Sequence, residues 1–186
     1  MDNMIGKQLT SFCVRGYHQG NLVTVTDNDL LGKWNILFFY PADFTFVCPT
    51  ELGDMADHYS DFQNEDCEIY SVSTDSEYVH KAWADASDTI RRIHYPMLSD
   101  HSWILSEAFG VLVSGQALRA TFIIDPKVVI RSYEVNDMGI GRNAAEILRK
   151  LQAAKFVAEH GDQVCPANWQ PGDETLKPSL DLVGKL

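Results

Sequence analysis

Residues 34–51 read WNILFFYPADFTFVCPTE, and they hold a predicted strand, a turn and the start of a predicted helix. The aromatic and aliphatic run over 34–40 is typical of a buried strand. After the turn, apolar residues recur at helical spacing at Leu52, Met55, Ala56, Tyr59 and Phe62. We therefore predict a strand over 34–40 and a helix over 48–63, with Cys48 at the helix start.

The position of Cys48 favours a reactive sulfur. Pro49 suits the first turn of a helix, because its missing N–H would be unpaired there anyway, and Glu51 adds a carboxylate to that turn. The free N–H groups and positive dipole end of a helix start favour a thiolate over a thiol. Thr45 places a hydroxyl that is expected to face the sulfur. The ordinary alternative is a buried, inert cysteine.

A second cysteine suggests the type of chemistry. Cys165 lies in GDQVCPANW, residues 161–169, which follows the last helical pattern and is interpreted as a mobile arm. One thiol at a helix start and another in a tail suit a disulfide that forms and breaks during turnover. Alone, Cys165 would be interpreted as incidental. Cys13 and Cys67 lie in strand-like runs and are predicted to be small core residues.

Bulk composition excludes several classes of protein. The chain has 186 residues and a net charge of −11, so one globular domain without a nucleic-acid or anionic-membrane surface is expected. It has no spanning apolar run and no signal-peptide core, which predicts a cytoplasmic location. Permanent disulfides are not expected there. Neither CxxC nor HExxH occurs, so no metal site is predicted.

The remaining elements predict an α/β fold with a mixed sheet, because strands alternate with helices and an antiparallel hairpin comes late in the chain. A capping box of Thr74 and Glu77 is expected to start one of the helices. Residues 160–186 are predicted to form an arm without periodicity. The expected elements are a hairpin within 8–26, strands 67–73 and 95–98, helices 74–87, 102–109 and 143–159, and a hairpin of strands 119–125 and 128–135.

Two arginines have alternative interpretations. Arg119 begins the apolar strand RATFIID, where it is either a plain strand-edge charge or a cation that stabilises the Cys48 thiolate. Residues 139–144, GIGRNA, match GxGxxA, but no second parallel strand follows, so nucleotide binding is not predicted. Arg142 then lies at a helix start, where the dipole repels it, and a carboxylate partner is expected.

Several segments together resemble the typical two-cysteine peroxiredoxins. They are FFYPADFTFVCPTELGD, CEIYSVSTD, HKAW, RATFIIDP, GIGR, QVCPANW and the ending SLDLVGKL. The resemblance covers nearly the whole chain and implies a thioredoxin-like fold, with a mixed central β-sheet flanked by helices. It implies a peroxidase domain over residues 1–160 and an extended C-terminal arm over 161–186. The implied activity is reduction of hydrogen peroxide and organic hydroperoxides.

The resemblance also assigns roles to residues. Cys48 corresponds to the peroxidatic cysteine, and Cys165 to the resolving cysteine, which in this family bonds to the other subunit. Glu51 and Arg142 correspond to a supporting ion pair. The positions that surround the reactive sulfur are Pro41, Thr45 and Arg119, and aromatic positions nearby are Trp83 and Trp169.

The implied partners are a peroxide, a second copy of the chain, and a separate reductase, either an NADH-dependent flavoprotein subunit or thioredoxin. The resemblance also implies a ring of five dimers and no bound cofactor or metal. Family members that over-oxidise easily carry a Gly-Gly-Leu-Gly insertion and a C-terminal Tyr-Phe pair, and this chain has neither. Two other classes remain: a Cys–His hydrolase or transferase, which needs a histidine beside Cys48, and a chaperone or scaffold.

Overall fold

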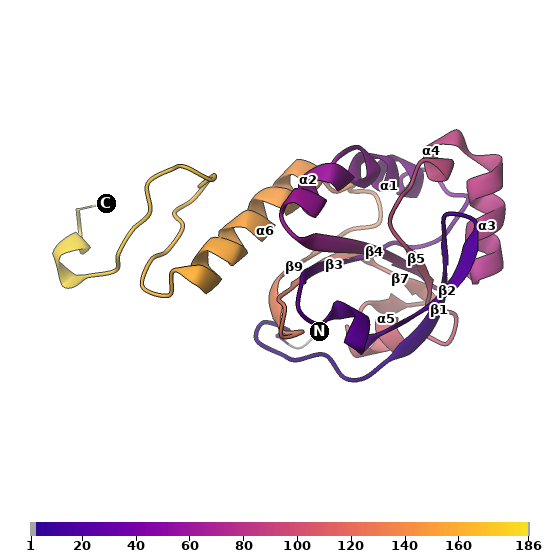
Figure 1. Cartoon of the computed structure of the whole chain (residues 1–186), viewed down its shortest axis with the longest axis horizontal. Coiled ribbons are helices and arrows are strands. Elements are labelled where there is room, and N and C mark those ends of the chain that lie inside the picture. Colours follow the sequence, from indigo (N-terminus) through magenta and orange to yellow (C-terminus); the bar gives the residue numbers. More distant parts are fainter. Residues whose placement is uncertain (1–2, 186) are drawn as a thin grey trace. The chain divides into compact units, whose positions relative to one another are not determined.

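The computed structural model describes residues 3–185, shown in Figure 1. The chain separates into two compact units, Met1–Ala144 and Ala145–Leu186. Most of the last helix therefore groups with the C-terminal segment, and the domain boundary expected between residues 160 and 161 stays a prediction. Within the described residues, no helix has the length and apolar content needed to cross a bilayer.

The first unit is built on a mixed seven-stranded sheet, as predicted, with the order β2-β1-β5-β4-β3-β8-β9. Strand β4 pairs in parallel with β3 on one side and with β5 on the other. All other pairings in this sheet are antiparallel. The strands are β1 (Cys13–His18), β2 (Asn21–Thr26), β3 (Trp34–Phe39), β4 (Cys67–Ser73), β5 (Met97–Ser99), β8 (Arg119–Ile124) and β9 (Ile130–Asn136).

The central strand β3 is buried along its whole length, because β4 and β8 flank it and both faces are covered. On one face Phe39 packs against Phe109 and Phe122, with ring centroids 5.2 and 5.8 Å away. This packing fixes the end of the strand from which the Pro41–Val47 turn leads to Cys48.

Helices lie on both sides of the sheet, with α1 and α2 above it and α5 below it in the view of Figure 1. The helices are α1 (Cys48–Asp57), α2 (Tyr59–Asn64), α3 (Glu77–Ala86), α4 (Asp88–Arg91), α5 (Ile104–Ala108) and α6 (Ala144–Glu159), and two short 3₁₀ turns cover Asp27–Leu30 and Leu180–Leu182.

Two sequence expectations about elements are corrected. The single helix expected over 48–63 is divided at His58, whose backbone leaves helical geometry at ψ 4°. The capping box is wrong: α3 begins at Glu77 after Ser76, and the Thr74 hydroxyl donates to the Gly115 carbonyl instead. Glu77 is engaged by Arg15 of β1 at 3.0 Å, so the tertiary partner prevails over the local cap.

The short helix α4 and the hairpin of β6 (Leu112–Val113) and β7 (Gln116–Ala117) are among the elements that were not expected. The short helix α4 starts at a Ser87 cap, whose hydroxyl accepts from Ile90 N–H. The turn residues of the hairpin, Ser114 and Gly115, both have positive φ. Such two-residue turns match the twist of a hairpin.

The C-terminal unit has internal structure beyond α6. The arm folds back on itself through a bridge between Val164 and Leu176. Trp169 packs on Phe156 of α6 at 5.1 Å between ring centroids, and its carbonyl accepts from Arg149 at 3.1 Å. The arm is therefore tied to its own helix.

Candidate active site

Cys48 is the first residue of α1, as predicted, and its side chain is 0% exposed. The preceding turn has an unusual backbone, because Phe44 adopts φ 54°, a conformation that L residues rarely take. The Phe44 ring lies 5.8 Å from that of Trp83 on α3. The turn therefore has a defined shape, which delivers the sulfur to the buried start of the helix.

Arg119 is the hydrogen-bond partner of Cys48, with Nη1 3.4 Å from the sulfur. The same nitrogen donates to Glu51 at 2.7 Å, and Nε donates to the Met138 carbonyl at 2.7 Å. Arg119 is 4% exposed, so the interpretation as a strand-edge charge does not hold. Burial lowers its pKa, but the contacts with Cys48 and Glu51 outweigh burial and leave the pKa above its ordinary value.

Glu51 joins Arg119 to Arg142. Its Oε1 accepts from Arg142 Nε at 2.8 Å and from the Arg142 backbone N–H at 2.9 Å, and its Oε2 accepts from Nη2 at 3.0 Å. Burial raises the pKa of Glu51, but the bonds and charge of Arg142, with the charge of Arg119, hold it below its ordinary value. Glu51 is therefore the carboxylate partner that the position of Arg142 requires.

Arg142 is held by further contacts that the sequence did not reveal. Its Nη1 donates to the Ala120 carbonyl at 2.8 Å, and its guanidinium lies 3.4 Å from the centre of the Phe38 ring. Gly141 before it leaves room for Val47, since a Cβ there would meet Val47 at 3.4 Å. Gly141 thus lies against Val47, the residue that precedes Cys48, whereas a Cβ on Gly139 would meet only the Asp137 side chain at 3.8 Å.

The Cys48 sulfur lies beside a cluster of buried charges. Arg119 and Arg142 carry two positive charges and Glu51 one negative charge, all three buried. Buried charges are costly unless they are compensated. The Arg119 guanidinium beside the sulfur and the positive end of α1 both stabilise negative charge that develops on Cys48.

Thr45 and Pro41 lie in the turn as expected, but the Thr45 hydroxyl donates to the Ala42 carbonyl at 2.8 Å rather than to the sulfur. Pro41 is buried and follows the end of β3 by two residues. Their roles at the sulfur stay predictions. In residues 3–185 no hydrogen bond joins a histidine to Cys48, which counts against the Cys–His hydrolase.

The other cysteines have different surroundings. Cys165 is partly buried in the C-terminal unit, where its sulfur lies 3.9 Å from the Ala153 carbonyl. Burial raises the pKa of the Cys165 thiol, and the nearby Arg149 charge opposes this only in part. Cys67 is buried as predicted, but Cys13 is exposed, so its assignment to the core is wrong. Strand alternation directs Cys13 outward, while its neighbour Val14 is buried.

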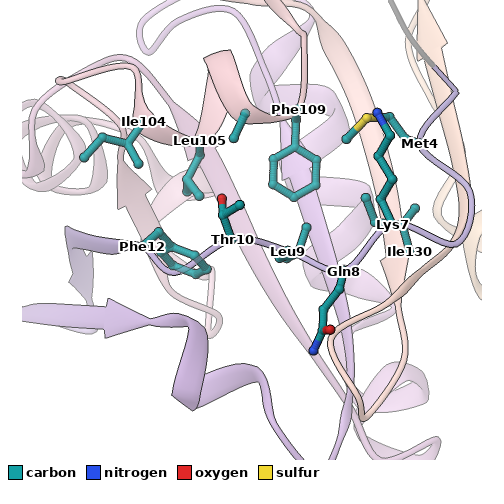
Figure 2. A pocket seen from close by; sticks show the side chains of 11 residues that line it. Met4, Lys7, Gln8, Leu9, Thr10, Phe12, Ile104, Leu105, Phe109 and Ile130 are labelled. Atoms are coloured by element: carbon teal, nitrogen blue, oxygen red, sulfur yellow. The ribbon is translucent and has the colours of Figure 1, made fainter.

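A separate apolar cavity of about 130 Å³ is shown in Figure 2, between the N-terminal segment and α5. Met4, Phe12, Ile104 and Phe109 line it. Phe109 packs on Phe39, whereas the Arg142 guanidinium lies over Phe38, the preceding residue of β3. Successive strand residues point to opposite faces, so this cavity and the Cys48 cluster lie on opposite faces of the sheet. No group of three or more potential ligands in residues 3–185 is arranged for a metal ion.

The fold is thioredoxin-like, and a buried cysteine at the start of α1 forms a hydrogen bond with an arginine. These two features together are typical of a thiol-dependent oxidoreductase. Comparison with known proteins gives the family. Residues 5–133 match the AhpC/TSA family, and residues 153–186 match the C-terminal domain of 1-Cys peroxiredoxin. The chain belongs to the AhpC/TSA family of peroxiredoxins.

Individual relatives agree with this family. The alkyl hydroperoxide reductase C of Salmonella typhimurium is 47% identical, and the match covers 99% of this chain and 100% of that protein. The crystal structure of Enterococcus faecalis AhpC has 59% identity and a TM-score of 0.87, covering 89% of this chain and 100% of that one. The reduced Plasmodium vivax 2-Cys peroxiredoxin has 33% identity and a TM-score of 0.91, covering 97% and 96%.

Proposed function

We propose that this chain is a thiol peroxidase of the alkyl hydroperoxide reductase C type, which reduces hydrogen peroxide and organic hydroperoxides through Cys48. The observation that carries the proposal is the buried contact of Cys48 with Arg119, which Glu51 links to Arg142. This arrangement suits a thiolate and supplies a cation beside it. The family membership supports the same reaction.

The first step uses the Cys48 thiolate as nucleophile. It attacks the terminal peroxide oxygen, the O–O bond breaks, and the sulfur becomes a sulfenic acid while water or an alcohol leaves with a proton. Arg119 donates hydrogen bonds to the sulfur and to the oxygens as negative charge moves onto the leaving group. Its remaining contacts with Glu51 and Met138 hold the guanidinium in place, so it does not have to reorganise during the reaction.

The second step forms a disulfide. The Cys165 thiolate of another copy attacks the Cys48 sulfenic sulfur, the S–O bond breaks, and the hydroxide takes up a proton as water. A separate protein, the alkyl hydroperoxide reductase flavoprotein subunit or thioredoxin, then returns both cysteines to thiols by exchange. A homodimer is the smallest assembly that this scheme requires. A pentamer of dimers and a cytoplasmic location stay predictions.

The test is peroxide consumption with each candidate reductant. Wild type and the exposed-cysteine control Cys13→Ser should both turn over. Cys48→Ser should lose the reaction, and Cys165→Ser should perform one oxidation and then stop with either reductase. A Cys48→Ser variant that still consumes peroxide would disprove the proposal.

A further inference from the structure

The apolar cavity of Figure 2 is a preformed feature of the fold, because the N-terminal segment that forms one wall is bonded to the edge of the sheet. The Gly6 N–H donates to the Ile130 carbonyl at 2.9 Å, and the Ile130 N–H donates to the Lys7 carbonyl at 3.0 Å. The Leu9 N–H donates to the Val128 carbonyl at 3.1 Å. These bonds fix the segment, so the space between it and α5 is held open.

The lining of the cavity favours an apolar occupant. Five of the side chains that form it are apolar and buried: Met4, Phe12, Leu105, Phe109 and Ile130. Protein interiors have few voids larger than a water molecule, and apolar walls offer water few hydrogen-bond partners. An apolar cavity of about 150 Å³ can hold benzene. The cavity of about 130 Å³ in this chain is therefore large enough for roughly five or six carbon atoms.

Lys7 places a positive charge at the rim of this cavity. Its side chain is exposed and extends past Ile130 toward Met4 in the view of Figure 2. Within residues 3–185 no carboxylate forms an ion pair with Lys7, although the chain has 26 acidic residues. Gln8 points away from the cavity and donates to the Lys127 carbonyl at 3.4 Å. An anionic group at the rim would therefore meet a cation that has no competing partner.

We propose that this cavity binds the alkyl chain of a short unbranched carboxylate, with the carboxylate paired to Lys7. The site lies on the opposite face of the sheet from Cys48, so it is separate from the place where peroxide reacts and does not depend on the proposed function. Phe109 forms part of the wall, and its ring lies 4.5 Å from that of Phe122 and 5.2 Å from that of Phe39. The bound chain thus packs against the aromatic core of the first unit.

The location of binding is tested with sodium hexanoate on the reduced full-length protein, with NMR spectra of methyl-labelled isoleucine and methionine. The signals of Met4 and Ile130 should shift as hexanoate is added. Met138 and Ile140 are exposed elsewhere in the same unit and serve as the internal reference, since the Met138 carbonyl accepts from Arg119. Shifts at Met138 and Ile140 alone would show that the carboxylate binds beside Arg119 and would overturn the proposal, as would the absence of any shift.

The length of the ligand tests the size of the cavity and needs no variant. From propanoate to hexanoate, each added methylene should lower the Kd about fourfold, because one more CH₂ group leaves water. The gain should end by octanoate, when the cavity of about 130 Å³ is full. A Kd that keeps falling at the same rate as far as decanoate would indicate an open apolar surface and would contradict an enclosed site.

Two variants separate the shape of the cavity from its charge. Ala108 lines the cavity on α5, so Ala108→Leu fills part of it and should weaken hexanoate binding about tenfold or more. Lys7→Gln should weaken hexanoate binding about two- to fivefold, as expected for an exposed ion pair, and should leave hexanol binding unchanged. Lys127→Gln removes the same charge from a neighbouring segment outside the cavity and is the matched control.

Each variant has its own contrary result. Hexanoate that binds Ala108→Leu as tightly as wild type would exclude this cavity as the site. Hexanoate that binds Lys7→Gln as tightly as wild type, or a loss of hexanol binding equal to that of hexanoate, would overturn the pairing of the carboxylate with Lys7. A wild type that consumes no peroxide would disprove the proposed function and leave these binding results unaffected.

Discussion

At the scale of single residues, Arg119 and Glu51 show how one buried cluster both keeps a positive charge beside the sulfur and compensates buried charge. The Arg119 guanidinium has to stay beside the sulfur and keep its positive charge. Glu51 holds Arg119 in place by a hydrogen bond and also accepts hydrogen bonds from Arg142. One carboxylate between two arginines leaves positive charge for the sulfur.

Replacing Arg119 should slow the first oxidation of Cys48. Loss of a charge-assisted contact of about 1.5–3 kcal/mol in the transition state corresponds to roughly ten- to a hundredfold in rate. Stopped-flow measurement of the second-order rate with peroxide, for wild type and Arg119→Ala, gives the value. Arg91→Ala is the control, because that side chain forms an exposed ion pair with Asp88 on α4. An unchanged rate in Arg119→Ala would show that its contact with the sulfur has no catalytic effect.

Ionisation of Glu51 should make the free energy of unfolding depend on pH in the acidic range. Its pKa in the folded chain lies below the ordinary value of 4.5, so the unfolded chain binds the proton more readily. Glu51 stabilises the folded chain fully at pH values above 4.5, the ordinary pKa. This stabilisation is lost as the pH falls from 4.5 toward the lower pKa of the folded chain. Urea unfolding at a series of pH values should show this loss, and Glu51→Gln should be less stable at neutral pH with a flatter acid limb. Parallel curves for the two proteins would contradict the assignment.

At the scale of elements, the sequence predicted the strands well because burial and alternation are local patterns. The run 67–73 matches β4, and the hairpin around Asp125 forms as expected. The break at His58 and the start of α3 could not be predicted, since they depend on partners distant in sequence, such as Arg15 for Glu77. The Cys48–Arg119 contact spans 71 residues, and residue types suggested it, but only the pairing of β3 with β8 brings the two together.

The pairing of β1 with β5 should be sensitive to a single methyl group. A Cβ on Gly16 would lie 2.6 Å from the Met97 carbonyl oxygen, which belongs to the backbone and cannot rotate away. Gly16→Ala should therefore destabilise the fold by about 1–3 kcal/mol, the usual cost of overpacking. Thermal or urea unfolding measures it. Gly161→Ala, where the added Cβ meets nothing within 4 Å, is the control. Equal stability of the two variants would contradict the predicted clash.

At the scale of the whole molecule, the chain divides its two proposed redox cysteines between two compact units. Cys48 lies in a rigid buried cluster, and Cys165 lies in an arm tied to its own helix by Trp169 and the Val164–Leu176 bridge. A disulfide between copies therefore requires local release on both sides. The pairing of Cys48 with Cys165 of another copy was predicted from the family resemblance. The separation of 117 residues between the two cysteines would not have predicted it alone.

Disulfide formation should join two chains. After peroxide treatment, non-reducing electrophoresis should give a dimer band in wild type that Cys165→Ser abolishes and Cys67→Ser retains, because Cys67 is buried in β4. A product that remains monomeric and internally bridged would contradict resolution between copies.

Activity should also persist in excess peroxide. The sequence contains neither a Gly-Gly-Leu-Gly segment nor a Tyr-Phe pair, the two features that the family resemblance links to slow release of the turn. Release of the turn should then outrun a second oxidation, which ordinary thiols do not reverse. Mass spectrometry during turnover at millimolar peroxide should show slow gain of sulfinic acid at Cys48. Rapid gain with falling activity would contradict this expectation.

The complete burial of Cys48 also means that the size of a reagent decides whether it can reach this sulfur. Cys13 is exposed and Cys48 is 0% exposed, so a bulky maleimide dye should label the least important sulfur first and the most important one last. A peroxide molecule has only a few atoms and needs a far smaller opening than the dye. Alkylating agents should thus react with Cys13 before Cys48, and peroxide should react with Cys48 before Cys13, so only the reaction with peroxide identifies the working thiol.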